Sequence, residues 1–128
     1  MTFTKSITVY NSHEQDFKKI LLPTLLKGVH AEVTKGTGHT ADGDNNADKL
    51  LVIIPFNSNR GYALPQAYES TEDKSGIWTL TTGDIITVGD TGAAEDFAEL
   101  SARAEVFRIT EIKRFDFGGL PHWEVTAR

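Results

Sequence analysis

The segment LLVIIPF, residues 50–56, decides the fold that we expect of this chain. It is an unbroken apolar run rich in β-branched residues, and it ends at Pro55. Such a run, bounded by turn-forming sequence, is typical of a strand buried on both faces. It is also far too short to span a bilayer, so no membrane segment is expected.

Upstream of this run, apolar residues alternate with polar ones. Ile7 and Val9, together with Phe3, follow this pattern and predict a first strand that is half-buried or at an edge. Residues 28–33, GVHAEV, alternate cleanly and predict another strand. Between these two strands, residues 17–26 are apolar but contain Pro23, which cannot donate to a strand ladder. They therefore predict an irregular edge strand or a bent connection.

Downstream, the pattern predicts several short strands and one helix. Residues 77–80 and 84–88 are expected to be strands joined by a tight turn at Gly83, and residues 89–92 a further turn. Helical spacing of apolar residues predicts a helix over residues 93–104, with Thr91 as its cap.

The closing part of the chain also reads as β structure. Residues 106–112 alternate, residues 117–119 form a turn, and residues 122–127, HWEVTA, predict a final strand with Trp123 and Val125 on one face.

Two polar stretches, residues 35–48 and 57–75, are predicted to be long loops. Loops of this length in a compact domain are often functional. The whole pattern gives about seven or eight strands that do not alternate with helices, which disfavours a parallel α/β sheet. We therefore predict one all-β, mainly antiparallel domain over residues 1–128. It should be a small β-barrel or sandwich with one short helix and two long loops.

Composition narrows the function classes. With 128 residues, 39% of them hydrophobic, the chain can bury a core without cross-links. It has no cysteine, which excludes disulfides, zinc–thiolate sites and a thiol nucleophile. The net charge of −5 offers no electrostatic footprint for DNA or anionic lipid. The N-terminal segment lacks a basic stretch followed by an apolar one, so no secretory signal is expected.

The motifs that could carry chemistry fail on inspection. Asp42, Asp44, Asn46 and Asp48 resemble a calcium loop, but the positions that require Gly and Glu hold Ala47 and Ile53. The four histidines do not pair at helical spacing, and no nucleophile elbow or phosphate loop occurs. A distant pair of carboxylates remains open. We accordingly predict no catalytic, cofactor-binding or metal-binding residues and no enzyme activity.

The loops and their flanking aromatics are instead the candidate interface. Exposed aromatic residues favour protein contacts, although these could equally cover the end of a barrel. His122, beside Trp123, is expected to have a packing or interface role. The candidate interface residues are Lys35, His39, Asp42, Asp44, Asn46, Phe56, Arg60, Tyr62 and Tyr68.

The order of segments carries a resemblance. It runs TVYN, LKGVHAEVTKG, LLVIIPF and GIWTLTTGDIITVGD, and closes with FRITEIKRFDFGGLPHWEV. This order resembles a family of small proteins encoded in the head–tail module of tailed phages and prophages of Gram-positive bacteria. The most specific part is the ending, an F-x-I-T strand, a DFGG turn and HWEV. Members are labelled minor capsid or head–tail connector proteins.

The resemblance implies a head-completion subunit of the stopper type, in which a β-barrel with long loops forms a ring. Its implied partners are the portal or adaptor above and the tail-terminator protein below, and its implied location is the neck of the virion, after assembly in the host cytoplasm. DNA would pass such a ring without specific binding, because phosphate binding depends on Lys and Arg. No membrane partner is expected.

Two other roles stay open. One is a tail-terminator, capsid decoration or other minor capsid protein of the same module. The other is a small ligand-binding β-barrel or minor hydrolase, which a deep apolar pocket with convergent polar groups would favour.

Overall fold

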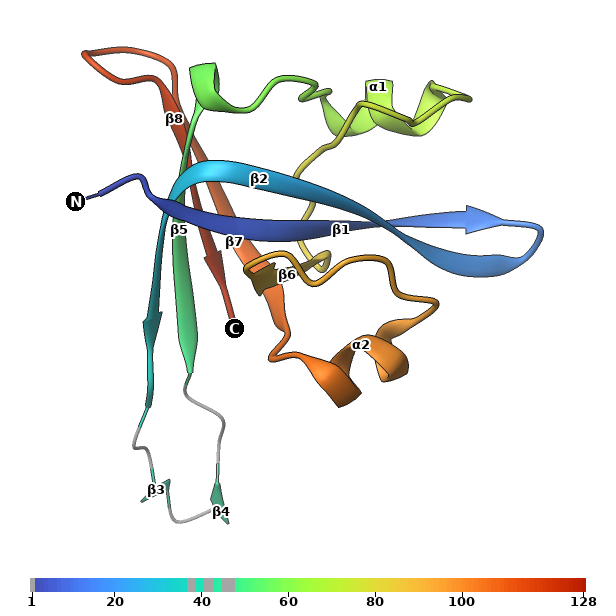
Figure 1. The fold of residues 1–128 in the computed structure, drawn as a ribbon, viewed down its shortest axis with the longest axis horizontal. Helices are drawn as coiled ribbons and strands as arrows, with labels where there is room; N and C mark the ends of the chain where they lie inside the picture. The colour runs from blue at the N-terminus through green and yellow to red at the C-terminus, as the bar shows by residue number, and fades with distance from the viewer. Residues whose placement is uncertain (1, 37–38, 41–42, 45–47) are drawn as a thin grey trace.

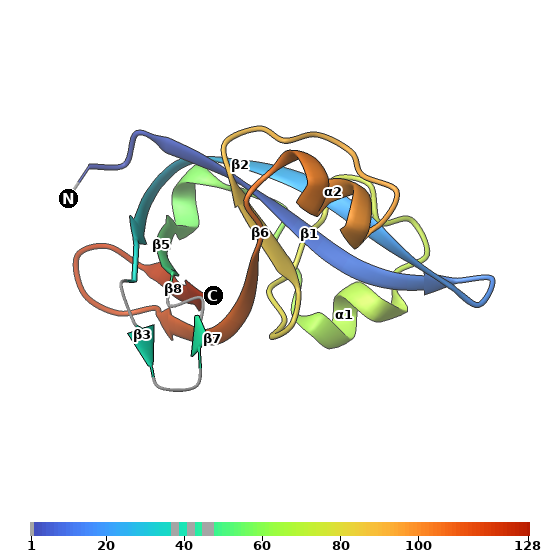
Figure 2. The ribbon, with the colours of Figure 1, turned by 90° about the horizontal axis from the view of Figure 1, so that it is seen from below.

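The computed structural model describes residues 2–36, 39–40, 43–44 and 48–128, and of residues 39–40, 43–44 and 58 the backbone only. Six strands close into an antiparallel barrel in the order β1-β2-β5-β8-β7-β6, with β6 returning to β1. Figure 2 shows this ring of strands from below. The expected fold class is confirmed, with the barrel rather than the sandwich. The barrel strands are β1 (Lys5–Gln15), β2 (Lys18–Thr34), β5 (Lys49–Pro55), β6 (Ile85–Val88), β7 (Phe107–Phe115) and β8 (His122–Ala127).

The remaining elements are short. β3 (His39–Thr40) and β4 (Gly43–Asp44) pair with each other outside the barrel, and η1 (Phe56–Ser58) is a single 3₁₀ turn. Two helices, α1 (Pro65–Ser70) and α2 (Phe97–Arg103), lie on opposite sides of the β1–β2 hairpin (Figure 1). None of the helices described has the length and apolar character needed to cross a membrane.

Side chains from every barrel strand fill the interior. Alternate residues point inward, as the pleat requires, and the two tryptophans, Trp78 and Trp123, are nearly inaccessible. A second, smaller cluster lies outside the wall, where Leu100 of α2 packs with Tyr10, Leu21 and Ile85. The interior cluster contains Ile7, Val9, Leu26, Val29, Leu50, Val52, Ile54, Trp78, Leu80, Ile86, Phe107, Ile109, Trp123, Val125 and Ala127.

β2 is one strand of 17 residues, although the sequence predicted a break near Pro23. Tyr10 of β1 faces Pro23, and the pairing stays regular on both sides of it. The bend comes later, at Gly28, where the β1–β2 register shifts by one residue and φ is +68°. A glycine in this conformation suits a bulge. It turns β2 from its partner β1 toward its second partner, β5.

Three expectations for the middle of the chain are wrong. Residues 77–80 form no strand beyond a single bridge from Trp78 to Tyr62. The polar stretch 57–75 contains α1, which begins at Pro65, a residue suited to the first turn of a helix. The helix expected over residues 93–104 begins only at Phe97, because the side chain of Asp96, and not Thr91, accepts from the backbone N–H of Glu99.

Candidate functional site

The outer part of the β1–β2 hairpin projects from the barrel and is the most distinctive surface of the molecule (Figures 1 and 2). We call residues 11–24 the arm. β6 pairs with β1 only over residues 7–10, and β5 pairs with β2 only from His30 onward. The arm strands are therefore paired with each other and leave both outer edges without a neighbouring strand among the described residues.

Side chains protect the points where these edges leave the barrel. The backbone N–H of Ser12 donates to Oδ1 of Asp84 at 3.3 Å. On the other edge, the amide of Asn59 accepts from the N–H of Lys27 and donates to its carbonyl. Along a strand, the backbone N–H groups point alternately toward one neighbouring strand and the other. The backbone nitrogen of Pro23, like that of Lys27, therefore faces the open edge. It has no N–H to offer, so the edge is blunted there.

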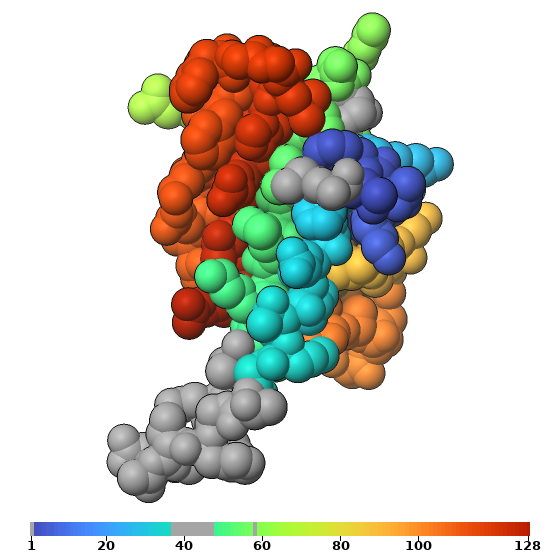
Figure 3. Space-filling model, turned by 90° about the vertical axis from the view of Figure 1, so that its left-hand side faces the viewer, coloured from blue at the N-terminus to red at the C-terminus, as the bar shows by residue number. Residues whose placement is uncertain are grey.

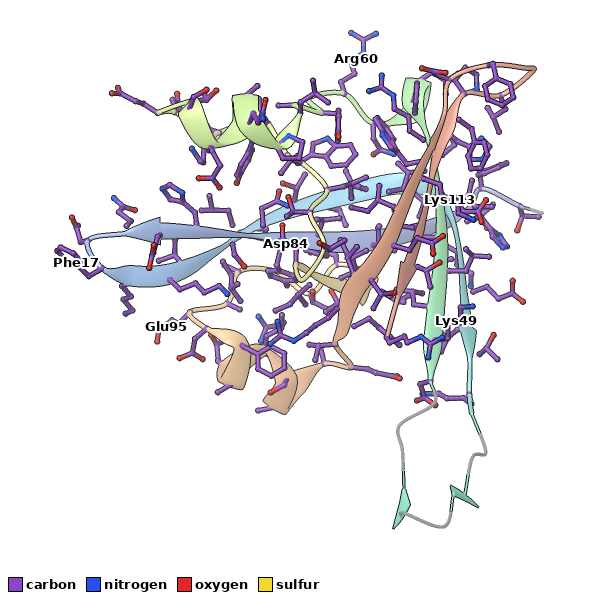
Figure 4. The ribbon with its side chains drawn as sticks, turned by 180° about the vertical axis from the view of Figure 1, so that it is seen from behind. Phe17, Lys49, Arg60, Asp84, Glu95 and Lys113 are labelled. Atoms are coloured by element: carbon purple, nitrogen blue, oxygen red, sulfur yellow. The ribbon has the colours of Figure 1, made fainter. Side chains whose placement is uncertain are left out.

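The tip of the arm is a two-residue turn, Asp16–Phe17, between the paired residues Gln15 and Lys18. Both turn residues have positive φ, +53° and +63°, which is the signature of a type I′ turn. Glycine is favoured at the second position, yet Phe17 occupies it and is fully exposed, at 106%. Figure 4 shows its side chain at the far end of the arm. Among the described residues, no contact of the Phe17 side chain offsets this unfavourable conformation.

A groove of about 660 Å³ lies behind the tip. One wall is the inner face of the arm, with His13, Ile20 and Leu22, and the other is formed by the end of α1 and the segment that follows it, residues 69–77. Glu69 and Glu72 lie on this second wall and are exposed. In the described structure, the Nδ1 atom of His13 is enclosed and has no hydrogen-bond partner. The groove thus combines apolar side chains with a rim that carries two glutamates and Lys74.

A buried polar cluster holds the base of the arm. Asn11, 1% exposed, donates from Nδ2 to the carbonyl of Thr79 at 2.8 Å and to Oδ2 of Asp84 at 3.0 Å. Its Oδ1 accepts from the N–H of Thr79. This side chain takes the place of a strand partner, which explains why residues 77–80 pair with no strand. Burial raises the pKa of Asp84 above its usual value, against the opposing effect of these hydrogen bonds.

The aromatic candidates close the end of the barrel. Phe56 and Tyr62 lie 4.1 and 4.5 Å, between ring centroids, from Trp123. Tyr68 is 2% exposed, and burial raises its pKa to about 12. Phe56 and Tyr62 thus have the covering role, one of the two readings that the sequence left open. Arg60 is exposed and points away from the barrel (Figure 4), and its role at an interface stays a prediction.

The candidates in the loop 35–48 are described only in part. The ammonium of Lys35 lies 3.0 Å from Oδ2 of Asp48 and 2.6 Å from Oε1 of Glu105, so it closes the neck of the loop. The hydrogen bond that Lys35 donates to Glu105 is the main cause that raises the pKa of Lys35. His39 pairs with Asp44 through the backbone of β3 and β4. Asp42 and Asn46 lie outside the described residues.

A second exposed apolar group lies at the β7–β8 turn. Phe117 is 73% and Leu120 38% exposed. Figure 3 shows this turn at one end of the face where β8, β5 and β2 lie side by side. His122 stacks on Phe115 at 5.0 Å, in keeping with the packing role expected of it. No group of three or more His, Cys, Asp or Glu residues in the described ranges could hold a metal ion.

The sequence reading missed the arm, its tip and the polar cluster at its base. Phe17 was predicted as part of an apolar run and Asp84 as the start of a strand, and Asn11 was given no role. The sequence carries little signal for the tip, because residues 18–26 do not alternate and Asp16–Phe17 lacks the glycine that marks a two-residue turn. No pattern in the sequence indicates the Asn11–Asp84 contact, because the two residues are 73 positions apart.

The fold and site together define a closed six-stranded antiparallel β-barrel that carries a projecting hairpin arm and a groove beside it. The chain belongs to DUF6751, a family of unknown function whose model matches residues 1–128. No curated protein and no solved structure matches it.

Proposed function

We propose that this protein is a structural subunit of a phage particle. Its role is that of a head–tail connector, a stopper or head-completion protein that forms a ring between the portal or adaptor and the tail. The observation that carries the proposal is the arm, a paired hairpin that projects from a rigid barrel and ends in a fully exposed phenylalanine. A ring subunit needs both parts, a core that keeps its shape and an extension that reaches a neighbour.

The resemblance of the segment order, including the FRITEIKRFDFGGLPHWEV ending, supports the same role. That ending forms β7, the exposed β7–β8 turn and β8. The turn gives the barrel a second exposed apolar tip, Phe117, apart from the arm. Two separate contact points fit a subunit that touches more than one partner.

The charge also fits. A net charge of −5 gives a surface that weakly repels phosphate, so DNA would pass a ring of these subunits without being held. The function as proposed needs no catalysis, since the subunit acts through its surfaces. In the assembled virion it would lie in the neck.

A ligand-binding barrel remains the alternative of a different class. The barrel interior is occupied by buried side chains, Trp78 and Trp123 among them, so a ligand inside it would have to displace them. The groove beside the arm lies outside the barrel wall and suits a protein segment better than an enclosed small molecule.

Deletion of the gene from a phage or prophage that carries it tests the proposal. We expect tailless particles that leak DNA, with tails restored when the wild-type protein is supplied in trans. The gene should lie between portal and major capsid genes upstream and tail genes downstream. Normal tailed virions from the deletion strain would refute the proposal.

Labelling of the tagged protein in complemented particles separates the roles within the module. Label at the neck supports the connector. Label at the upper end of the tail tube identifies a tail terminator, and label over the capsid lattice identifies a decoration or other minor capsid protein.

A further inference from the structure

We propose that the arm tip of one subunit docks in the arm groove of a second copy, with Phe17 as the buried anchor. The inference deepens the proposed function, because it specifies the contact between neighbouring subunits of the ring. It can nevertheless be tested on the purified protein alone.

The tip has the features of an anchor. Phe17 is fully exposed and has a left-handed backbone, with φ at +63°. At 106% exposure, its side chain packs against none of the described residues. Burial of a phenylalanine ring removes about 150–250 Å² from water, which would offset the unfavourable backbone. Because the arm is a paired hairpin, the ring cannot fold back onto the groove that lies behind it in the same subunit.

The groove has the features of the matching socket. Its apolar lining includes Ile20, Leu22 and Ile77, and its volume of about 660 Å³ leaves room for an aromatic ring and the turn that carries it. Cores of protein interfaces are typically apolar with a polar rim. Here the rim holds Glu69 and Glu72, which are exposed. Lys74 also lines the groove, but its ammonium donates to the carbonyls of Glu69 and Thr71 and lies over the Tyr68 ring.

Charge favours a second copy as the occupant. Lys18 follows Phe17 directly and is exposed, so an arriving tip would bring an ammonium group to the acidic rim. Within the described residues, neither Lys18 nor either glutamate forms an ion pair of its own. Opposite charges at a rim guide the encounter and fix the register.

Tip and groove are different surfaces, so the contact can repeat from one subunit to the next. Such a head-to-tail contact closes into a ring when the rotation between subunits allows it. One phenylalanine side chain in one groove buries less than the roughly 1,200 Å² of a standard protein interface. Association in solution should therefore be weak and is best detected by trapping it covalently.

Because the chain has no cysteine, a disulfide can form only between cysteines that are introduced by mutation. Two single-cysteine variants, Asp16→Cys and Ser70→Cys, are mixed under mild oxidation, and the heterodisulfide is measured by mass spectrometry. Asp16 is exposed beside Phe17, and its replacement keeps the phenylalanine ring. Ser70 lies on the wall of the groove and is exposed. The matched control, Asp116→Cys, replaces the exposed aspartate beside Phe117 and is mixed with the same partner. We expect the Asp16 variant to couple at least ten times faster than the control. Equal rates would overturn the inference.

A charge exchange gives a second readout. The double variant Glu69→Lys, Glu72→Lys, placed in the Ser70→Cys chain, should slow coupling to Asp16→Cys several-fold. Adding Lys18→Glu to the Asp16→Cys chain should restore the rate. Failure of both effects would show that the rim is not contacted, against the inference.

The outcomes separate this contact from the proposed role in the virion. Coupling without any effect of the gene deletion on tails would uphold the contact and refute the connector. A neck-located protein whose Asp16→Cys variant couples no faster than the control would uphold the connector and refute this contact.

Discussion

Asn11 and Asp84 are joined by a hydrogen bond of 3.0 Å across 73 residues of sequence. The same Asn11 side chain both donates to and accepts from the backbone of Thr79. One amide thus ties the base of the arm to the segment that crosses toward β6, and the carboxylate of Asp84 holds the backbone of Ser12 beside it.

Replacing Asn11 with alanine should therefore destabilise the fold markedly. The change leaves the backbone of Thr79 and a buried carboxylate without their partner, which costs about 2–4 kcal/mol in the free energy of unfolding. Urea unfolding followed by tryptophan fluorescence measures the loss. The control Asn57→Ala, at an exposed position, should change it by less than about 0.5 kcal/mol. Equal effects would contradict the role of the cluster.

The pKa of Asp84 gives stability a pH dependence of known sign. Burial raises this pKa above its ordinary value of 3.8. The contribution of the protonated group is complete below 3.8 and is lost as pH rises through the folded pKa. Compared with Asp84→Asn, the wild type should therefore lose stability between pH 4 and pH 7.

Asp73 offers the opposite case for comparison. Hydrogen bonds from Ser75 lower its pKa below 3.8, so its contribution is lost as pH falls through the folded pKa. Asp73→Asn should leave the slope between pH 4 and pH 7 unchanged. If it altered that slope as Asp84→Asn does, the effect could not be assigned to Asp84.

Phe17→Gly should raise the melting temperature. Glycine adopts the left-handed conformation of the turn without strain, and no packing is lost because the ring is exposed. The gain is about 1 kcal/mol, a shift of a few degrees that calorimetry resolves. Phe17→Val, β-branched at the same φ, should lower it. If Phe17→Gly raises the melting temperature, any loss of subunit contact in this variant cannot be attributed to unfolding.

Gly61 and Gly83 form a matched pair for substitution by alanine. Their φ angles are +92° and +93°, so the conformational cost is the same. A Cβ on Gly61 would clash with the carbonyl oxygen of Gly76, whereas one on Gly83 meets nothing within 4 Å. Gly83→Ala should cost about 1–2 kcal/mol, and Gly61→Ala clearly more. Chemical unfolding of both variants tests the difference.

The β strands of the wall could be predicted because their residues alternate or run apolar according to burial. Residues 50–56 and 122–127 are the clearest cases, since β5 and β8 follow them closely. The joining of residues 17–26 and 28–34 into one strand could not be predicted. It depends on the outward position of Pro23 and on the bulge at Gly28, both set by pairing with β1.

The candidate site was harder to predict, because exposure is decided by distant contacts. Tyr68 and Phe17 are both large aromatic residues beside polar sequence. Tyr68 is 2% exposed, whereas Phe17 is fully exposed at a tip beyond the barrel. Lys35 could be placed in a loop from its neighbours, but its partner Glu105 comes from 70 residues away.

The number of paired residues between neighbouring strands also differs around the barrel. β6 has four residues, and it meets β7 only through the pairs Ile85–Arg108 and Ile86–Phe107, whereas β8 pairs with β7 from Ala127 back to His122. When thermal motion opens the wall, it should part at β6 first. Backbone amides there should exchange with solvent deuterium well before those of Val52 and Val125. The barrel wall therefore has one weak point, at β6, where local unfolding begins.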